Sequence, residues 1–433
     1  MIDEREIIRR RDMREVFTFT IDPADAKDFD DAISFHAMED GYQIGVHIAD
    51  VSFYVKPNTK IDDEAYERGT SVYLVDRVIP MLPEELSNDL CSLRPGEDKL
   101  CMSVVFTMDS EAHVLKHKIC RTVIRSNARL NYDEAQAIIM ANQTNDTHGK
   151  SGEDEELKQA ILTLNTLATK LRAERIANGA LTIEQDEMRF KLDEHHHPIQ
   201  IYFEKPNEAH HLIEEFMLLA NRTVAKDAGS GRPFVYRVHD LPDYDKLEEI
   251  KKFKKQNGPK VKGEALQRVV DMLTIRAQAK AVYSTYNIGH YGLAFSHYTH
   301  FTSPIRRYPD LMVHRLVEKY ILTGKKETMS REEMEMMCEH CSACEQEAAQ
   351  AERDSIKLFQ TMWMADHLGE VLPGHIISIM DFGFFVQLDE THCEGLVRME
   401  LIEHPEDFVL GDPVLVQVIR VDVNRSQIDF ELV

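Results

Sequence analysis

The sequence predicts an α+β protein, in which a mixed α/β domain over residues 1–365 precedes a small all-β barrel over residues 366–433. Three observations support this prediction. In the first third of the chain, apolar residues mostly alternate with polar ones, as they do in strands. From Asn131 to about Gly369 they recur mainly at helical spacing. Short β runs separated by turn residues then return, over a length typical of a small separate domain.

The composition is that of a globular protein and narrows the possible functions. The 433 residues carry a formal net charge of −24, with 43% hydrophobic and 29% charged side chains. This balance excludes a disordered acidic tail and a uniformly basic nucleic-acid binder. No apolar stretch reaches the ~18 residues of a membrane span, and the charged N-terminus is unlike a signal peptide. Since seven cysteines are too few for a disulfide scaffold, we expect a cytoplasmic monomer without membrane contact.

The expected elements follow in order along the chain. A charged helix over residues 3–15 comes first. Strands are predicted at 17–22, 42–55, 99–109 and 113–124, with the last two paired. Helices are predicted at 131–143, 153–179, 208–227, 243–256, 264–284, 309–323 and 329–369, and a hairpin at 188–204. The strands of the C-terminal barrel are expected at 374–380, 383–389, 394–400, 413–423 and 427–433.

A cluster of aspartates marks the end of the first predicted strand. The run TIDPADAKDFDDAIS holds Asp22, Asp25, Asp28, Asp30 and Asp31 within ten residues. Carboxylates this close oppose one another's ionisation unless a cation lies among them, and hard divalent cations prefer oxygen ligands. A solvated acidic turn is the alternative, but apolar residues bound the loop on both sides. The pattern favours a Mg²⁺ site for phosphate chemistry, in which two ions hold the attacking and leaving oxygens.

A pair of arginines lies just before a predicted helix in HYTHFTSPIRRYPDLMVHR. Arg306 and Arg307 follow a Ser-Pro turn, and Pro309 suits the first position of the helix. Guanidinium groups at such a place can hold a phosphate in a bidentate manner. Salt bridges at the surface or between domains are the alternative. Together with the carboxylates, the arginines indicate phosphodiester hydrolysis.

Three other features have simpler interpretations. Cys338, Cys341 and Cys344 recur every third residue around His340, which suggests a metal or iron–sulfur site. The long helix expected there favours a packing stripe instead. The His195–His197 triplet lies in the hairpin turn and is expected to be solvated. Finally, Gly149-Lys150-Ser151 imitates a phosphate-binding loop but lacks the first glycine, which Thr144 replaces.

These motifs resemble the catalytic domain of the ribonuclease II/ribonuclease R exoribonucleases, the RNB family. TIDPADAKDFDDA and FTSPIRRYPD carry the resemblance, and GTSVYLVDRVIPMLPEELSNDLCSL and HLIEEFMLLAN extend it in the family's order. HFTSPIRRYPD is closer to the ribonuclease R branch. The tail, GHIISIMDFGFFVQL with EGLV and GDPVLVQV, resembles an OB-fold RNA-binding repeat named after a ribosomal protein.

The resemblance implies a processive enzyme that hydrolyses single-stranded RNA from its 3′ end to nucleoside 5′-monophosphates with Mg²⁺. Asp22 and Asp31 would hold metal, while Asp28 and Asp30 would bind a second metal or activate water. Arg306 would stabilise charge on the scissile phosphate. The alternative is an RNA-binding protein without turnover.

The resemblance also implies contacts with the substrate. Tyr73 would help to set the end product, and Glu214 would lie near the terminal ribose, with Tyr132 as a weaker candidate for ribose contact. The further residues expected to touch RNA are Arg307, Glu352, Phe382 and Phe384. For the two phenylalanines, a place in the barrel core is an equally open interpretation.

The chain also departs from the family pattern. The family carries two cold-shock domains before the catalytic domain, and none is expected here. Ile183 occupies the place of a base-stacking aromatic residue, and Arg398 that of a histidine that helps to stack RNA. With such an acidic chain, RNA is expected to contact local basic features, including the lysine-rich run 251–262. We therefore predict a negative exterior around a positively charged internal channel.

Overall fold

A seven-stranded sheet organises the first two thirds of the protein, whose computed structural model describes residues 2–143, 152–182, 186–257, 264–326 and 329–433. The strand order is β1-β8-β7-β4-β3-β2-β9, and neighbours are antiparallel except in the parallel pairs β1–β8 and β2–β9. The strands are β1 (Arg11–Asp12), β2 (Thr18–Asp22), β3 (Asp31–Met38), β4 (Gly41–Ala49), β7 (Asp98–Met108), β8 (Val114–Arg125) and β9 (Ala128–Asn131). The predicted pairing of 99–109 with 113–124 is confirmed as β7–β8.

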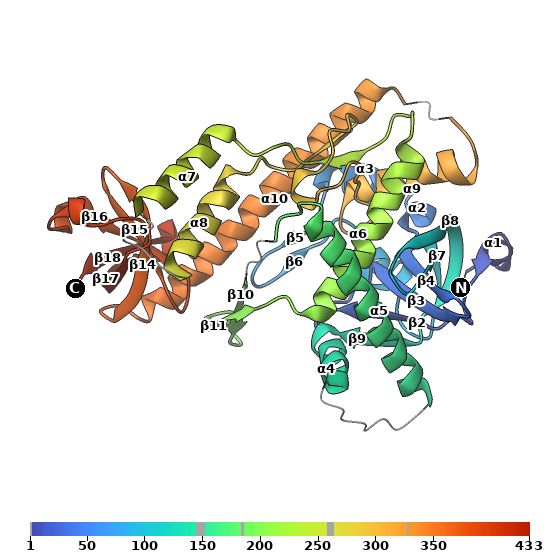
Figure 1. Ribbon diagram of the computed structural model, residues 1–433, viewed down its shortest axis with the longest axis horizontal. Helices are drawn as coiled ribbons and strands as arrows, with labels where there is room; N and C mark the ends of the chain where they lie inside the picture. Colours follow the sequence, from blue (N-terminus) through green and yellow to red (C-terminus); the bar gives the residue numbers. More distant parts are fainter. Residues whose placement is uncertain (1, 144–151, 183–185, 258–263, 327–328) are drawn as a thin grey trace.

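Helices cover this sheet and bury its apolar side chains. The helices α4 (Tyr132–Gln143), α5 (Gly152–Ala177) and α6 (Glu208–Gly229) pack on one another, and α6 also contacts β4 (Figure 1). Around the sheet lie α1 (Glu4–Ile8), α2 (Val51–Tyr54), α3 (Lys60–Arg68), α9 (Tyr308–Val317) and the short pair β5 (Val72–Tyr73) and β6 (Val78–Ile79). Because β2 is buried along its whole length, the loop that follows it begins inside the molecule.

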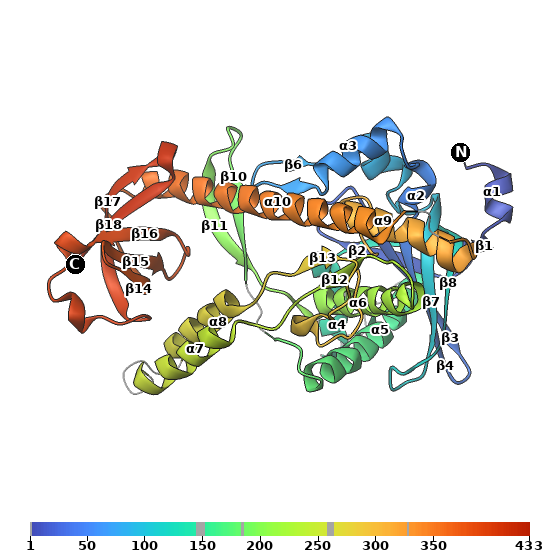
Figure 2. The ribbon, with the colours of Figure 1, turned by 90° about the horizontal axis from the view of Figure 1, so that it is seen from above.

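The longest helix joins the two domains. Helix α10 (Arg331–Ala365) contains 35 residues and begins with a capping box between Ser330 and Glu333. It contacts β5 and β13 (Val282–Ser284) of the first domain and strands of the barrel (Figure 2). The hairpin of β10 (Glu187–Leu192) and β11 (Pro198–Glu204) packs beside it, with Phe190 against Phe359.

The C-terminal strands form a closed barrel with its own core. Their order is β14-β15-β16-β18-β17, from β14 (Val371–Met380), β15 (Gly383–Leu388), β16 (Glu394–Arg398), β17 (Pro413–Asp422) and β18 (Gln427–Leu432). The predicted α+β class with a C-terminal barrel is therefore confirmed. A helical hairpin of α7 (Tyr244–Asn257) and α8 (Glu264–Ala277) lies near the barrel, and β12 (Tyr236–Val238) pairs with β13 (Figure 1).

Three predicted elements were too long. The N-terminal helix ends at Ile8, because Arg10 turns inward to an ion pair with buried Asp50 and residues 11–12 join the sheet. The strand expected over 42–55 ends at Ala49 and continues as α2. The helix expected over 264–284 ends at Ala277, since its last residues pair with β12 as β13. In the first and third cases a tertiary contact overrides local periodicity.

The cysteine stripe packs as expected. Cys338 and Cys341 are buried in the core of the first domain, and Cys344 lies against Gly69. The His195–His197 turn is confirmed, and His197 pairs with Asp366 at 2.8 Å. Thr144, the Gly149-Lys150-Ser151 motif, Ile183 and residues 258–262 lie outside the described residues. Among the described residues, no helix is long and apolar enough to cross a membrane.

Candidate active site

The aspartate cluster lies where two neighbouring strands meet. The strand β2 ends at Asp22, β3 begins at Asp31, and their antiparallel register (Phe19 opposite Ile33) puts both ends at one edge of the sheet. The intervening loop is held by Arg129, which donates to the backbone oxygens of Pro23 and Ala24 at 3.0 and 2.7 Å. The carboxylates of this loop are therefore fixed in place by the fold.

Burial and like charge make the cluster hard to ionise. Asp22 and Asp30 are 9% and 5% exposed. Burial raises the pKa of Asp22, with repulsion from Asp31 adding to it, and burial also raises the pKa of Asp31. Burial likewise raises the pKa values of Asp28 and Asp30, although nearby Arg306 opposes both shifts. This is the electrostatic condition in which additional positive charge would be favourable.

The four carboxylates suit a hard cation that the substrate helps to bind. The Oδ2 atom of Asp22 is buried and accepts no hydrogen bond, so it is free to act as a ligand. No three His, Cys, Asp or Glu side chains among the described residues form a closed metal-binding group. Mg²⁺ commonly takes only one or two carboxylates and completes its shell with water and phosphate oxygens. The residues therefore fit a magnesium site completed by a phosphate.

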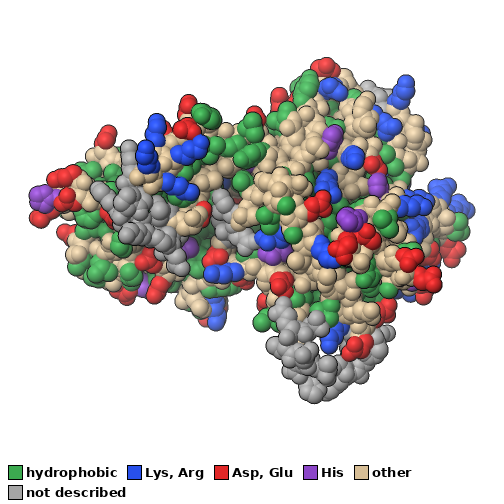
Figure 3. All heavy atoms as spheres, viewed as in Figure 1, with side chains coloured by type: hydrophobic (Ala, Val, Ile, Leu, Met, Phe, Trp, Pro, Cys, Tyr) green, Lys and Arg blue, Asp and Glu red, His purple; other side chains and the backbone are tan. Residues whose placement is uncertain are grey.

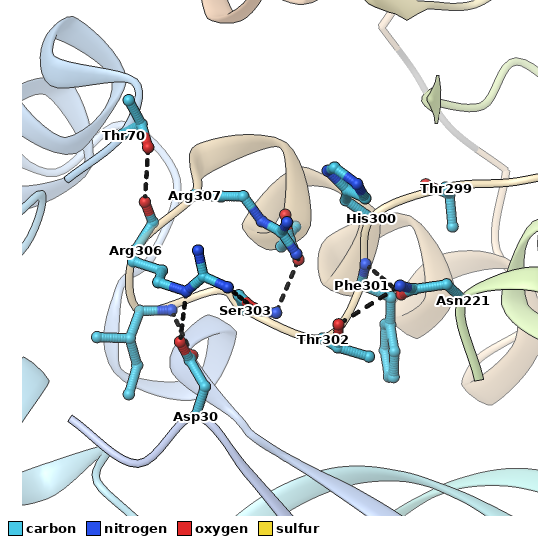
Figure 4. Close-up of polar contacts among 12 residues, drawn as sticks. Asp30, Thr70, Asn221, Thr299, His300, Phe301, Thr302, Ser303, Arg306 and Arg307 are labelled. Carbon is cyan, nitrogen blue, oxygen red and sulfur yellow. Dashed lines mark hydrogen bonds and ion pairs between the residues drawn. The ribbon is translucent and has the colours of Figure 1, made fainter. Parts of the chain in front are cut away.

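The arginine turn faces this cluster directly (Figure 4). The backbone N–H of Ile305 donates to Asp30 Oδ1 at 3.0 Å, and Arg306 Nε lies 3.7 Å from Asp30 Oδ2. Arg306 also donates to the Ser303 hydroxyl at 3.0 Å and remains 41% exposed. One face of its guanidinium is therefore accessible while its position relative to the carboxylates is set. The two motifs, far apart in sequence, form one site.

Arg307 points away from the carboxylates (Figure 4). Its guanidinium donates to buried Asp310 at 2.9 Å, and only 17% of its side chain is exposed. The Asp310 carboxylate also accepts from the Ser303 N–H at 2.7 Å. The expectation that Arg307 contacts RNA is not supported by this geometry, because the side chain is engaged inside the protein, where it braces the turn.

A buried asparagine anchors the start of the same loop. Asn221 of α6 accepts from the Phe301 N–H at 2.9 Å and donates to Thr302 at 3.4 Å (Figure 4). It also donates to the Tyr298 hydroxyl at 3.3 Å. Asn221 is 3% exposed among the apolar residues of α6, and a polar residue at such a position is the feature of the sequence that could indicate this role. His314 also supports the loop, through a 2.8 Å hydrogen bond between its Nε2 and the Phe301 carbonyl.

The segment that carries Tyr73 is joined to the arginine turn. The Ser71 N–H and the Thr70 hydroxyl both donate to the Arg306 carbonyl at 3.0 Å. Asp28, Asp30 and Arg306 all affect the pKa of the Tyr73 phenol, which burial raises to about 12. Tyr73 therefore lies close to the carboxylates.

Glu352 reaches this segment from α10. Its Oε1 accepts from the Tyr73 backbone N–H at 3.0 Å, and Ser355, one turn later, accepts from the Val75 N–H at 3.1 Å. The glutamate expected to line the substrate channel thus supports the Tyr73 strand. It ties the helix that carries the barrel to the candidate active site.

Tyr132 begins α4 beside the cluster, and Glu214 lies in the second turn of α6. Tyr132 directly follows Asn131, the register partner of Asp22. Burial raises the pKa of its phenol, and the charges of Asp31 and Asp22 raise it further. Glu214 lies 3.4 Å from Arg175 and 3.6 Å from His211. It is 46% exposed, so it remains accessible.

The two barrel phenylalanines have different surroundings. Phe382 is 58% exposed and contacts Phe385 edge-on. The expectation that Phe384 stacks on RNA is wrong, because it is fully buried in the barrel core against Phe408. Along β15 alternate side chains point inward, so Phe385 is the partner of Phe382 on the surface. Arg398, opposite Gly383 in the register, lies nearby.

Comparison with known proteins agrees with this architecture. Residues 10–323 match the RNB domain and residues 366–432 match the S1 RNA binding domain. The chain belongs to the RNB-domain family. It is 39% identical to Ribonuclease R of Aquifex aeolicus and 38% identical to that of Thermotoga maritima. Each alignment covers 100% of this chain and 66% of the relative. The chain thus spans just under two thirds of these relatives.

A solved structure shows the same fold. The structure of Mycoplasma genitalium RNase R in complex with ribose methylated single-stranded RNA superposes with a TM-score of 0.90 at 27% identity. The superposition covers 100% of this chain and 73% of that one. Both the sheet and the barrel therefore belong to an architecture found in an RNA-bound relative.

Proposed function

We propose that this protein is a 3′→5′ exoribonuclease that degrades single-stranded RNA processively to nucleoside 5′-monophosphates. The observation that carries the proposal is the convergence of four aspartates with Arg306 at a buried site, in a chain of the RNB family. Carboxylates with raised pKa values beside one accessible guanidinium suit a reaction that needs cations at a phosphate. The S1-type barrel supplies a second surface for the same polymer.

The roles of the residues follow from their positions. Asp22, Asp28, Asp30 and Asp31 would hold Mg²⁺, which when bound lowers the pKa of water and stabilises charge on the phosphate. Arg306, fixed by Asp30 and Ser303, would donate to a non-bridging phosphate oxygen. Its bidentate fork suits the trigonal charge of the transition state better than a lysine would.

The substrate contacts are proposed on the same basis. Tyr132 and Glu214 would contact the terminal ribose, whose 2′-hydroxyl is what distinguishes RNA from DNA. Tyr73 would contact the nucleotides that remain when degradation stops. On the barrel, Phe382 and Phe385 offer aromatic faces on which bases can stack. All the proposed groups come from one chain, so a monomer would suffice, and the free cysteines suit a reducing compartment such as the cytoplasm.

The test is the pattern of products from a single-stranded RNA that is labelled at its 5′ end in one sample and uniformly in another. With Mg²⁺ we expect mononucleotides from the 3′ end together with a short labelled remnant, and few intermediate lengths while substrate is in excess. EDTA should abolish release, and excess Mg²⁺ should restore it. Early internal fragments would indicate an endonuclease. Binding of intact RNA without any release would favour the alternative, an RNA-binding protein without turnover.

A further inference from the structure

A histidine lies flat against Tyr132 at the edge of the candidate active site. The rings of Tyr132 and His210 are 3.8 Å apart between centroids and 10° from parallel. Tyr132 is the first residue of α4, and His210 lies in the first turn of α6. The contact therefore joins the N-terminal turns of α4 and α6.

His210 is itself held in place by contacts at the start of α6. Its Nδ1 lies 3.3 Å from the Asn207 backbone nitrogen and 2.8 Å from Asn207 Oδ1, while the His210 backbone N–H donates to Asn207 Oδ1 at 3.2 Å. This reciprocal capping box uses a histidine where Glu or Gln is usual. The Ala209 N–H also donates to Gln136 of α4 at 3.2 Å, which fixes the two helices relative to each other. The imidazole is thus held in one position by hydrogen bonds.

The position of the Tyr132 phenol depends on the His210 imidazole. Tyrosine has two rotatable side-chain bonds, and a ring stacked on one face cannot rotate freely about either. A phenol is protonated at neutral pH, so it can both donate and accept a hydrogen bond. A hydroxyl of this kind beside the proposed phosphate site can recognise another hydroxyl, provided that it is correctly placed.

We propose that His210 is a positioning residue that sets sugar selectivity, by holding the Tyr132 phenol where it meets the 2′-hydroxyl of the terminal ribose. The inference rests on the proposed function of the site. His210 need not touch RNA for this role. It acts by restricting Tyr132, so its loss should reduce the discrimination between ribose and deoxyribose more than the rate of hydrolysis.

The experiment compares two oligoribonucleotides that differ only in a 3′-terminal ribose or 2′-deoxyribose. In His210→Ala we expect the ratio of their kcat/KM values to fall about tenfold, the equivalent of one hydrogen bond. His210→Phe, which loses the cap but keeps a flat ring, should retain the ratio within about threefold. Glu208→Ala, at an exposed position in the same turn, is the matched control. In Tyr132→Phe, the His210→Ala substitution should cause no further loss of selectivity.

Equal loss of rate on both substrates in His210→Ala would overturn the inference, since it would show a merely structural role. So would an unchanged ratio. To separate this outcome from failure of the proposed function, binding of the same two oligonucleotides is measured in the Asp30→Asn background. The selectivity of binding should fall with His210→Ala there, even if the wild type releases no mononucleotides.

Discussion

At the scale of single residues, the aspartates are placed against their own electrostatic preference. Burial raises the pKa values of Asp22 and Asp31, and repulsion between these two carboxylates adds to the shift at Asp22. A carboxyl group whose pKa is raised by folding contributes stability below its unfolded pKa of about 4. That contribution is lost as the pH rises through the raised values in the folded state. The metal-free protein should therefore weaken toward neutral pH because of this cluster.

We predict that EDTA-treated protein gains more stability from Mg²⁺ at pH 8 than at pH 5. At pH 8 more of the carboxylates are ionised and a bound cation offsets their repulsion, whereas at pH 5 protons do so. Urea denaturation at both pH values, with and without Mg²⁺, measures the difference. Asp22→Asn should reduce the Mg²⁺ effect at pH 8. A Mg²⁺-independent midpoint at pH 8 would argue against a metal site.

His47 provides a pH dependence of the opposite sign. It is fully buried in the sheet, between Ser103 and Ser34 at 2.7 and 2.8 Å, and burial lowers its pKa to about 3. Since the unfolded pKa is about 6.5, its contribution to stability is complete above that pH and is lost toward the lower folded value.

We therefore predict that His47 lowers the free energy of unfolding by up to ~1.4 kcal/mol per pH unit below pH 6.5. His47→Gln should be less stable at neutral pH but should lose this part of the slope. Denaturation curves from pH 7 to pH 5 test the prediction, with exposed His113→Gln as the control. An unchanged slope in His47→Gln would count against it.

The residue types at the site were predictable, but several of their roles were not. The aspartate spacing and the arginine turn indicate phosphate chemistry from the sequence alone, and the structure brings Asp30 and Arg306 together. Arg307 and Phe384 were assigned to RNA because charge and aromaticity carry no information about direction. Whether Phe384 faced the core depended on the phase of β15, which short apolar runs leave ambiguous. The roles of Arg129 and Asn221 depend on hydrogen bonds to residues that are distant in the sequence.

At the scale of elements, the loop 298–307 is supported by side chains of α6, α9 and the acidic loop. Asn221 of α6, Asp310 of α9 and Asp30 of the acidic loop each accept one of its backbone N–H groups. The buried N–H of Phe301 would lose its hydrogen bond to a side chain if Asn221 were removed. This arrangement explains how a loop without regular structure can place Arg306 reproducibly.

Accordingly, Asn221→Ala should lower the free energy of unfolding by about 1–3 kcal/mol, the cost of a buried unsatisfied donor. It should also reduce kcat more than it raises KM, because Arg306 would be less well placed. Lys226→Ala, an exposed substitution on the same helix, should change neither. A stable variant with full activity would show that Asn221 does not determine the position of the loop.

Helix and strand ends were the least predictable elements. The amphipathic pattern of α6 predicted residues 208–227, close to the observed Glu208–Gly229. By contrast, the pattern at residues 3–15 is helical in isolation, yet Arg10 gains more from its ion pair with Asp50 inside the protein. Such a contact between distant segments is invisible to local periodicity. The same reason accounts for β13 within the expected helix 264–284.

At the scale of the whole molecule, α10 connects the candidate active site to the C-terminal barrel. Its middle supports Tyr73 through Glu352, and its end packs against the barrel that presents Phe382. Despite the net charge of −24, Lys and Arg side chains gather over the face of α7 (Figure 3). Lys251, Lys252, Lys254 and Lys255 of this helix are exposed. The channel of positive charge predicted from the sequence remains a prediction, and α7 is a candidate for its outer end.

We predict that changing these four lysines to Gln weakens RNA binding, mostly at low salt. Each lysine that contacts a phosphate contributes about 0.7 to the slope of log K against log salt for single strands. The variant should therefore show a shallower slope, measured by fluorescence anisotropy from 50 to 300 mM salt. Lys116→Gln with Lys118→Gln, at the opposite end of the molecule on β8, should keep the slope of the wild type.

The most direct test of the central claim is mononucleotide release from single-stranded RNA with Mg²⁺, compared between Asp30→Asn and Asp25→Asn. Asp30 is buried beside Arg306, whereas Asp25 is an exposed carboxylate of the same loop. The account predicts a loss of at least about 100-fold for Asp30→Asn and near wild-type release for Asp25→Asn, with both variants folded. Equal release by Asp30→Asn and the wild type would contradict the assignment of this site.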